Sequence, residues 1–154
     1  MDTDAFTIEY KVDGALNLYN AMVGSAIKDI LVDGVSLDEI ANYYAQGITF
    51  VLDNGYEVSF ETGKVDARDV ADSVTYEEQP PLTIDPLDAE QVIGRRIKAV
   101  WVDSMTNTFY DDEFGTNKTL RLFIEYGHLP MNIFKTVSTK RDDDGPAIHV
   151  QIRR

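Results

Sequence analysis

The chain has 154 residues, of which 44% are hydrophobic and 27% charged, and it contains no cysteine. This length favours a single domain, residues 1–154, whose core is large enough to fold without a metal or a disulfide. The absence of cysteine excludes disulfide frameworks, thiolate catalysis and cysteine-based metal centres, and the apolar content argues against a disordered chain.

Acidic residues outnumber basic ones by 27 to 14, which gives a net charge of −13. The excess lies in residues 1–94, with 19 acids and 4 bases, whereas residues 95–154 hold 8 acids and 10 bases. Such a surface repels nucleic acid and anionic lipid, and it attracts and orients a basic protein partner. The same charge also fits a protein that is merely soluble, so charge alone does not choose between the two interpretations.

The first residues have neither a positive region nor an apolar run of the kind that a secretory signal needs. The longer apolar stretches, such as 48–52 and 99–102, fall far short of the roughly 20 residues that cross a bilayer. We therefore expect a cytoplasmic protein with no membrane partner.

Residues 6–12 alternate apolar and polar side chains, which predicts a half-buried strand. From residue 15 to 32 the apolar residues recur at intervals of three and four, which predicts one long amphipathic helix that ends at Asp33-Gly34. Residues 36–46 fit both a helix and a strand; we favour a short helical turn at 36–39 that leads into a strand.

Asp53-Asn54-Gly55 supplies turn residues between two alternating runs, 48–52 and 56–60, and predicts a tight hairpin. Residues 62–92 form an acidic, loop-rich insert, either a connector or a binding arm. Within the insert, the spacing of acids and valines over 62–76 predicts a weak, exposed helix. Asp85-Pro86 then predicts the start of a short helix over 87–93.

The rest of the chain is predicted to be β-structure. Alternation predicts strands over 97–102, 120–124, 129–137 and 148–152, with a turn at Glu125-Tyr126-Gly127 and a long polar loop over 105–118. The units 40–60 and 97–133 share a polarity pattern, each with a glycine at its second turn. We expect an α+β fold: a mostly antiparallel sheet of two meander-like units, covered by the long N-terminal helix.

Motifs of catalysis are missing from the sequence: it has no glycine-rich phosphate loop, no nucleophile elbow and no pair of histidines at metal-binding spacing. His128 and His149 are interpreted as ordinary solvent-facing or structural residues. The acidic runs 111–113 and 142–144 lack the alternating ligands of a calcium loop. We therefore predict no catalytic residue, no metal and no cofactor, and a protein that is not an enzyme.

Surface aromatics beside acidic runs are typical of interfaces, because aromatic residues anchor contacts and carboxylates meet a partner's arginine or lysine. The stretch 109–114 has this character, and the insert adds further acids. The same aromatics also fit a role in covering the sheet. The predicted contact residues are Asp66, Asp69, Asp72, Glu77, Glu78, Tyr110, Asp111, Asp112 and Glu113.

Size, charge, missing catalytic motifs and the meanders around 53–55 and 125–127 together resemble the small acidic immunity proteins that accompany bacterial toxins, including those of contact-dependent inhibition systems. The resemblance implies a protein that binds a cognate toxin, often a basic nuclease, and blocks it. Two other interpretations stay open: a phage-encoded inhibitor or DNA mimic that acts on a defence nuclease, and a small structural or assembly protein. A fourth is an enzyme with an unrecognised carboxylate site.

Overall fold

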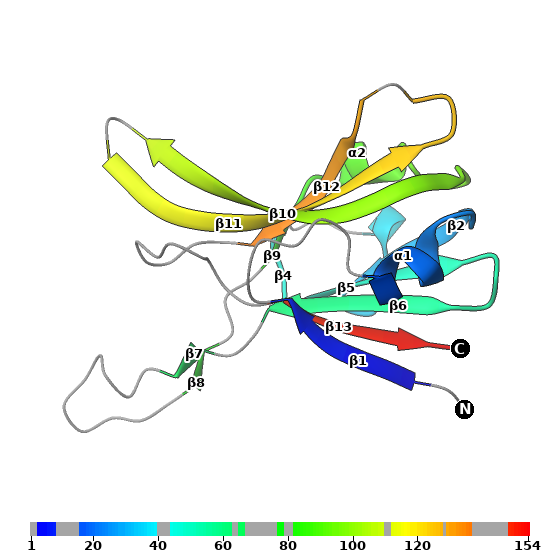
Figure 1. The fold of residues 1–154 in the computed structure, drawn as a ribbon, viewed down its shortest axis with the longest axis horizontal. Helices are drawn as coiled ribbons and strands as arrows, with labels where there is room; N and C mark the ends of the chain where they lie inside the picture. The colour runs from blue at the N-terminus through cyan, green and yellow to red at the C-terminus, as the bar shows by residue number, and fades with distance from the viewer. Residues whose placement is uncertain are drawn as a thin grey trace.

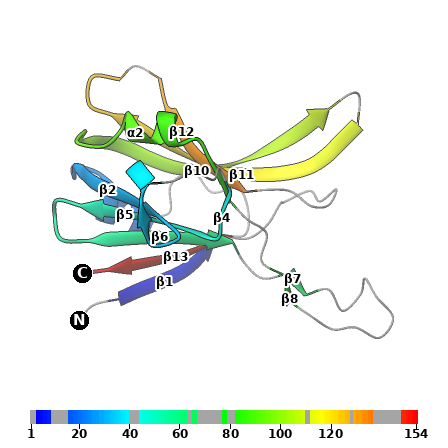
Figure 2. The same ribbon diagram turned by 180° about the vertical axis from the view of Figure 1, so that it is seen from behind.

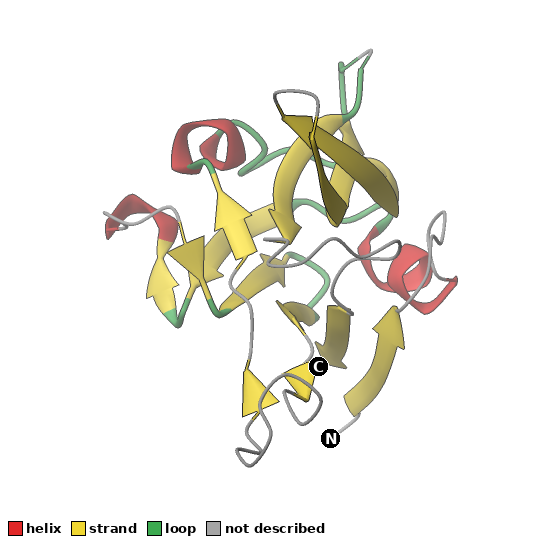
Figure 3. Cartoon of the chain, turned by 90° about the vertical axis from the view of Figure 1, so that its left-hand side faces the viewer, coloured by secondary structure: helices red, strands yellow, loops and turns green. Residues whose placement is uncertain are grey.

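The computed structural model describes residues 3–8, 16–39, 44–62, 65–66, 77–78, 82–109, 112–127, 129–136 and 148–154. Within these residues, strands dominate and every strand pair is antiparallel (Figure 3). The prediction of a mostly antiparallel α+β fold is confirmed in this respect.

The strands form two sheets that face each other (Figures 1 and 2). One sheet has six strands, in the order β1 (Thr3–Ile8), β13 (Ile148–Arg153), β6 (Glu57–Thr62), β5 (Gly47–Leu52), β2 (Ile27–Val32) and β3 (Val35–Ser36). The other has five, in the order β10 (Ile97–Phe109), β11 (Asp112–Ile124), β12 (Met131–Thr136), β9 (Leu82–Ile84) and β4 (Tyr44–Ala45). β7 (Val65–Asp66) and β8 (Glu77–Glu78) pair separately.

The core lies between the two sheets, and strands such as β5, β6 and β13 bury their alternate apolar residues in it. Phe60 of β6 and Phe134 of β12 meet there with ring centroids 5.1 Å apart, and Phe50 packs edge-on against Phe60. The helices are short: α1 (Leu16–Met22), the 3₁₀ turn η1 (Leu37–Glu39) and α2 (Pro86–Glu90). α1 buries Leu18 and Met22 completely against this core.

The elements with strong local signals are confirmed. β5 and β6 form the expected hairpin, closed by Asp53-Asn54-Gly55 with Gly55 at φ 91°. η1 is the helical turn expected at 36–39. α2 starts at Pro86, where the Asp85 carboxylate accepts a hydrogen bond from the Leu87 N–H at 3.0 Å. β12 and β13 also occupy predicted strands. Residue 137, the last of the strand predicted over 129–137, lies outside the described residues, and so do residues 9–12 of the strand predicted over 6–12.

The predicted long helix over 15–32 is wrong. α1 ends at Met22, Gly24 takes a positive φ of 89°, and Ile27–Val32 is strand β2. A register shift between Ile27 and Asp29 places a bulge in β2, so its buried residues fall three and then two positions apart. This spacing imitates a helical stripe. Asp33-Gly34 is not a helix cap but the β2–β3 turn, in which both residues have positive φ.

The predicted polar loop over 105–118 is also wrong. β10 and β11 are each 13 residues long, and their ladder runs on to the pair Phe109–Asp112. The segment contains Thr106, Thr108 and Thr116, and β-branched residues favour extended backbone although the sequence around them is polar. The turn predicted at 125–127 is confirmed, with Tyr126 at φ 66°.

Only one of the two predicted meanders exists. β10, β11 and β12 form the second, but in the first unit β5 pairs with β2, while β4 joins the other sheet beside β9. Two sheets therefore replace the single sheet that we expected. In the insert, residues 65–66 and 82–84 are strands rather than helix or loop, and residues 67–76 lie outside the described part of the chain.

The structure contains a different internal repeat. α1 and β2 match α2 and β10 at a separation of 70 residues, and the pattern Gly-x-x-Ile-Lys-x-x-x-Val-Asp occurs at both 24–33 and 94–103. The two copies meet in a symmetric pair of bonds: the Gly24 N–H donates to the Ile97 carbonyl at 2.8 Å, and the Gly94 N–H donates to the Ile27 carbonyl at 2.7 Å. The fold thus contains two related helix–strand units that are joined by this pair of hydrogen bonds.

Candidate functional site

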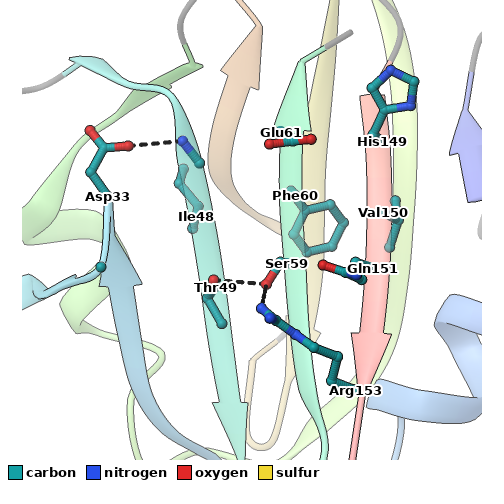
Figure 4. A pocket seen from close by; sticks show the side chains of 12 residues that line it. Asp33, Ile48, Thr49, Ser59, Phe60, Glu61, His149, Val150, Gln151 and Arg153 are labelled. Carbon is teal, nitrogen blue, oxygen red and sulfur yellow. Dashed lines mark hydrogen bonds between the residues drawn. The ribbon is translucent and has the colours of Figure 1, made fainter. Parts of the chain in front are cut away.

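The outer face of the six-stranded sheet carries a row of polar and short side chains. On β5, β6 and β13 the residues on the face away from the core are Gly47, Thr49, Val51, Glu57, Ser59, Glu61, His149, Gln151 and Arg153. All of these except Val51 and Glu57 line one hollow. Because glycine, threonine and serine are small, the sheet surface between the larger residues is hollowed. The hollow encloses about 480 Å³ and also reaches Asp33 at the end of β2 (Figure 4).

Hydroxyl groups line the centre of the hollow. Thr49 Oγ1 and Ser59 Oγ share a hydrogen bond of 2.9 Å across β5 and β6. Arg153 Nη2 donates to Ser59 Oγ at 3.0 Å, so a cation of β13 points along the sheet toward the middle strand (Figure 4). The three side chains form a continuous chain of hydrogen bonds over three strands, which fixes their rotamers and keeps the floor polar.

The opposite end of the hollow is acidic. Asp33 and Glu61 stand on either side of Gly47, which is the register partner of Glu61. Asp33 is held in place, since its Oδ1 accepts the N–H groups of Gln46 and Gly47 at 2.8 and 2.9 Å. We call this arrangement of Asp33, Gly47 and Glu61 the notch. It is bounded by His149, the register partner of Glu61 on β13.

The chemistry of the hollow is that of hydrogen bonding and charge. Ser59 bonds to a hydroxyl and to a guanidinium, neither of which activates a serine as a nucleophile. The side chains described here include no group of three or more histidines, aspartates or glutamates that could hold a metal ion. The arrangement therefore suits binding of a polar group.

Five of the nine predicted contact residues are described, and they fall on two projecting elements. Asp66 lies in β7, Glu77 and Glu78 form β8, and Asp112 and Glu113 begin β11. The β7–β8 ladder and the free end of the β10–β11 hairpin project from the same end of the molecule, at the left in Figure 1 and at the right in Figure 2. We call them together the acidic end. The predicted residues Asp69, Asp72, Tyr110 and Asp111 lie outside the described residues.

The structure pairs some of these residues and separates others. In the small ladder Asp66 is the register partner of Glu77, and in the hairpin Glu113 is the partner of Thr108. The β7–β8 ladder and the β10–β11 hairpin belong to different sheets. What their acidic residues share is the end of the fold at which they lie.

The hollow was not predicted from the sequence. His149 was expected at a polar position of the last strand, and it is exposed there as expected. The available signal was the alternation of Gly47, Thr49, Ser59 and Glu61 with buried apolar residues, which marks a sheet face of unusually small side chains. That signal does not reveal which strands are neighbours, so the contribution of β13 was hidden.

Comparisons with protein-family models, with curated proteins and with solved structures found no match. In the described part of the chain, no helix has the length and apolar character needed to cross a membrane.

Proposed function

We propose that this chain is a non-enzymatic binding protein that holds a basic protein partner by its acidic end and neutralises it, as an immunity protein does with a toxin. The observation that carries the proposal is the placement of its predicted contacts. Two acidic stretches far apart in the sequence project from the same end of the fold (Figure 1).

The distribution of charge supports this assignment. The segments 63–81 and 103–118, which contain β7, β8 and the outer part of the β10–β11 hairpin, carry nine acids and three bases between them. Negative charge concentrated in this way steers and orients a basic partner.

The β7–β8 ladder adds an energetic argument. A two-stranded ladder is marginally stable by itself, and here the register partner of Asp66 is Glu77. A partner that contacts both strands would add to the few interactions that hold the ladder, so binding and ladder formation support each other.

A capture experiment with the source organism's lysate tests the proposal. The protein is immobilised by a tag after Arg154, because the C-terminus lies at the end of the molecule opposite to the acidic end (Figure 1). We expect one basic protein to be retained at low salt and released as the salt concentration rises. Co-expression of that protein with and without this chain then measures neutralisation, as recovery of growth or loss of the partner's activity.

Charge-neutral variants test the surface. Asp66→Asn with Glu77→Gln and Glu78→Gln, and separately Asp112→Asn with Glu113→Gln, should each weaken capture about tenfold or more. The control has the same charge change as the first variant, but on exposed residues of η1 and α2: Glu39→Gln, Asp88→Asn and Glu90→Gln. Equal retention by all three variants, or a retained partner that is acidic, would show that the acidic end is not the binding surface.

A further inference from the structure

The notch has the shape and the charge of a receptor for one cationic side chain. Gly47 has no side chain, and its two neighbours across the sheet are the acids Asp33 and Glu61. Adjacent strands lie about 4.8 Å apart, so the two acids are separated by about 10 Å of backbone with open space between them. A guanidinium or ammonium group placed over Gly47 would lie between the two acidic residues.

Electrostatics choose the notch over the rest of the hollow. The guanidinium of Arg153 already occupies the other end, where it donates to Ser59 Oγ, and Glu57 is the register partner of Arg153 there. Asp33 is oriented before any ligand arrives, since the N–H groups of Gln46 and Gly47 hold its Oδ1; Figure 4 shows one of these two bonds. Preorganised carboxylates bind a guanidinium strongly because little side-chain freedom is lost on binding.

The notch also continues the acidic end. Glu61 is the penultimate residue of β6, and the chain enters β7 four residues later, at Val65. Figure 1 shows that β6 ends on the side of the molecule from which β7 and β8 project. A basic partner bound at the acidic end is therefore adjacent to the notch.

We propose that the notch of Asp33, Gly47 and Glu61 receives an arginine or lysine side chain of the partner. This inference rests on the proposed function and adds a specific anchor to it. Long-range charge brings the partner to the acidic end, and the notch fixes one basic residue against the sheet. The hydroxyls of Thr49 and Ser59 extend the polar surface on which the rest of that side chain lies.

Nuclear magnetic resonance with a small probe tests the notch directly. N-acetyl-arginine methylamide is titrated into the whole protein, and the neutral isostere N-acetyl-citrulline methylamide is the control ligand. We expect the arginine probe alone to shift the amide signals of Gly47 and Glu61, in a salt-dependent way. Acetate serves as an anionic probe, and shifts confined to the surroundings of Arg153 with acetate, without an arginine effect at the notch, would overturn the proposal.

Two variants separate charge from shape. Glu61→Gln should weaken binding of the arginine probe about tenfold. Glu57→Gln should leave the affinity of the probe unchanged, because Glu57 lies on the outer face of the same strand at its other end. Gly47→Val fills the notch without changing any charge. A Cβ at residue 47 would lie 3.5 Å from the Phe60 carbonyl oxygen, an ordinary contact, so the variant is expected to fold.

The same variants separate the two proposals. If Gly47→Val and Glu61→Gln bind the captured basic partner as tightly as the unaltered protein, while the variants of the acidic end lose it, the notch proposal fails and the proposed function stands. If neither set changes capture, both fail. If both sets weaken capture, and Glu57→Gln does not, the notch is an anchor of the interface.

Discussion

At the scale of single residues, Asn54 joins the β5–β6 turn to the first helix. Its Nδ2 donates to the Ala21 carbonyl at 3.0 Å and to Ser25 Oγ at 2.6 Å, and its Oδ1 accepts the Tyr56 N–H. Two partly buried hydrogen bonds and one exposed hydrogen bond depend on this one side chain, so we expect Asn54→Ala to lower the free energy of unfolding by about 2 kcal/mol. Denaturant unfolding followed by circular dichroism measures the change.

The neighbouring Asp53 supplies the control. Its Oδ1 accepts the Ala26 N–H at 3.0 Å, and Asp53→Asn keeps an oxygen at that place. We expect this variant to lower the free energy of unfolding by less than about 0.5 kcal/mol, because surface substitutions that keep the hydrogen bond have small effects. Equal effects of the two substitutions would mean that the turn tolerates the loss of its link to α1.

At the scale of elements, the β10–β11 hairpin has an inner part that covers the core and an outer part that projects away from the rest of the fold (Figure 1). Among the described side chains, the outermost pair with both residues in the core is Val102–Leu120. Residues 104–118 can be replaced by Asn-Gly, which closes a two-residue hairpin after the pair Asp103–Thr119. We expect the shortened protein to lose less than about 1 kcal/mol of stability and to keep its core resonances, while it loses the basic partner. If the shortened protein instead loses its dispersed core resonances, the outer part of the hairpin is required for folding.

The same elements show what sequence can predict. The β5–β6 hairpin and the start of α2 were predicted because their signals, Asp53-Asn54-Gly55 and Asp85-Pro86, are local. The bulge in β2 produced a false helical period over 27–32. Pairing between distant strands has no local signal at all: β13 lies between β1 and β6, although more than 80 residues separate it from either along the chain. The hollow depends on that pairing, so it could not be predicted.

At the scale of the whole molecule, the two sheets exchange strands between the halves of the chain. β13, from the C-terminal half, lies between β1 and β6 of the first sheet, and β4, from the N-terminal half, pairs with β9 in the second. The bonds between the Gly24 and Gly94 segments join the halves a third time. Neither half can complete its own sheet. We therefore predict that fragments 1–72 and 73–154, a cut that breaks no described strand, do not fold alone but regain the native spectrum when mixed.

The fragment experiment distinguishes strand exchange from simple apposition of two units. If each half were a complete domain, each would show a dispersed spectrum by itself, and mixing would add little. Because the first fragment lacks β13, it exposes the edges of β1 and β6, and we expect it to aggregate at high concentration. Removing 148–154 from the second fragment is the matching control. Complementation should then fail, since the first sheet loses the strand that connects β1 to β6, whereas persistence of the native spectrum would contradict the central place of β13.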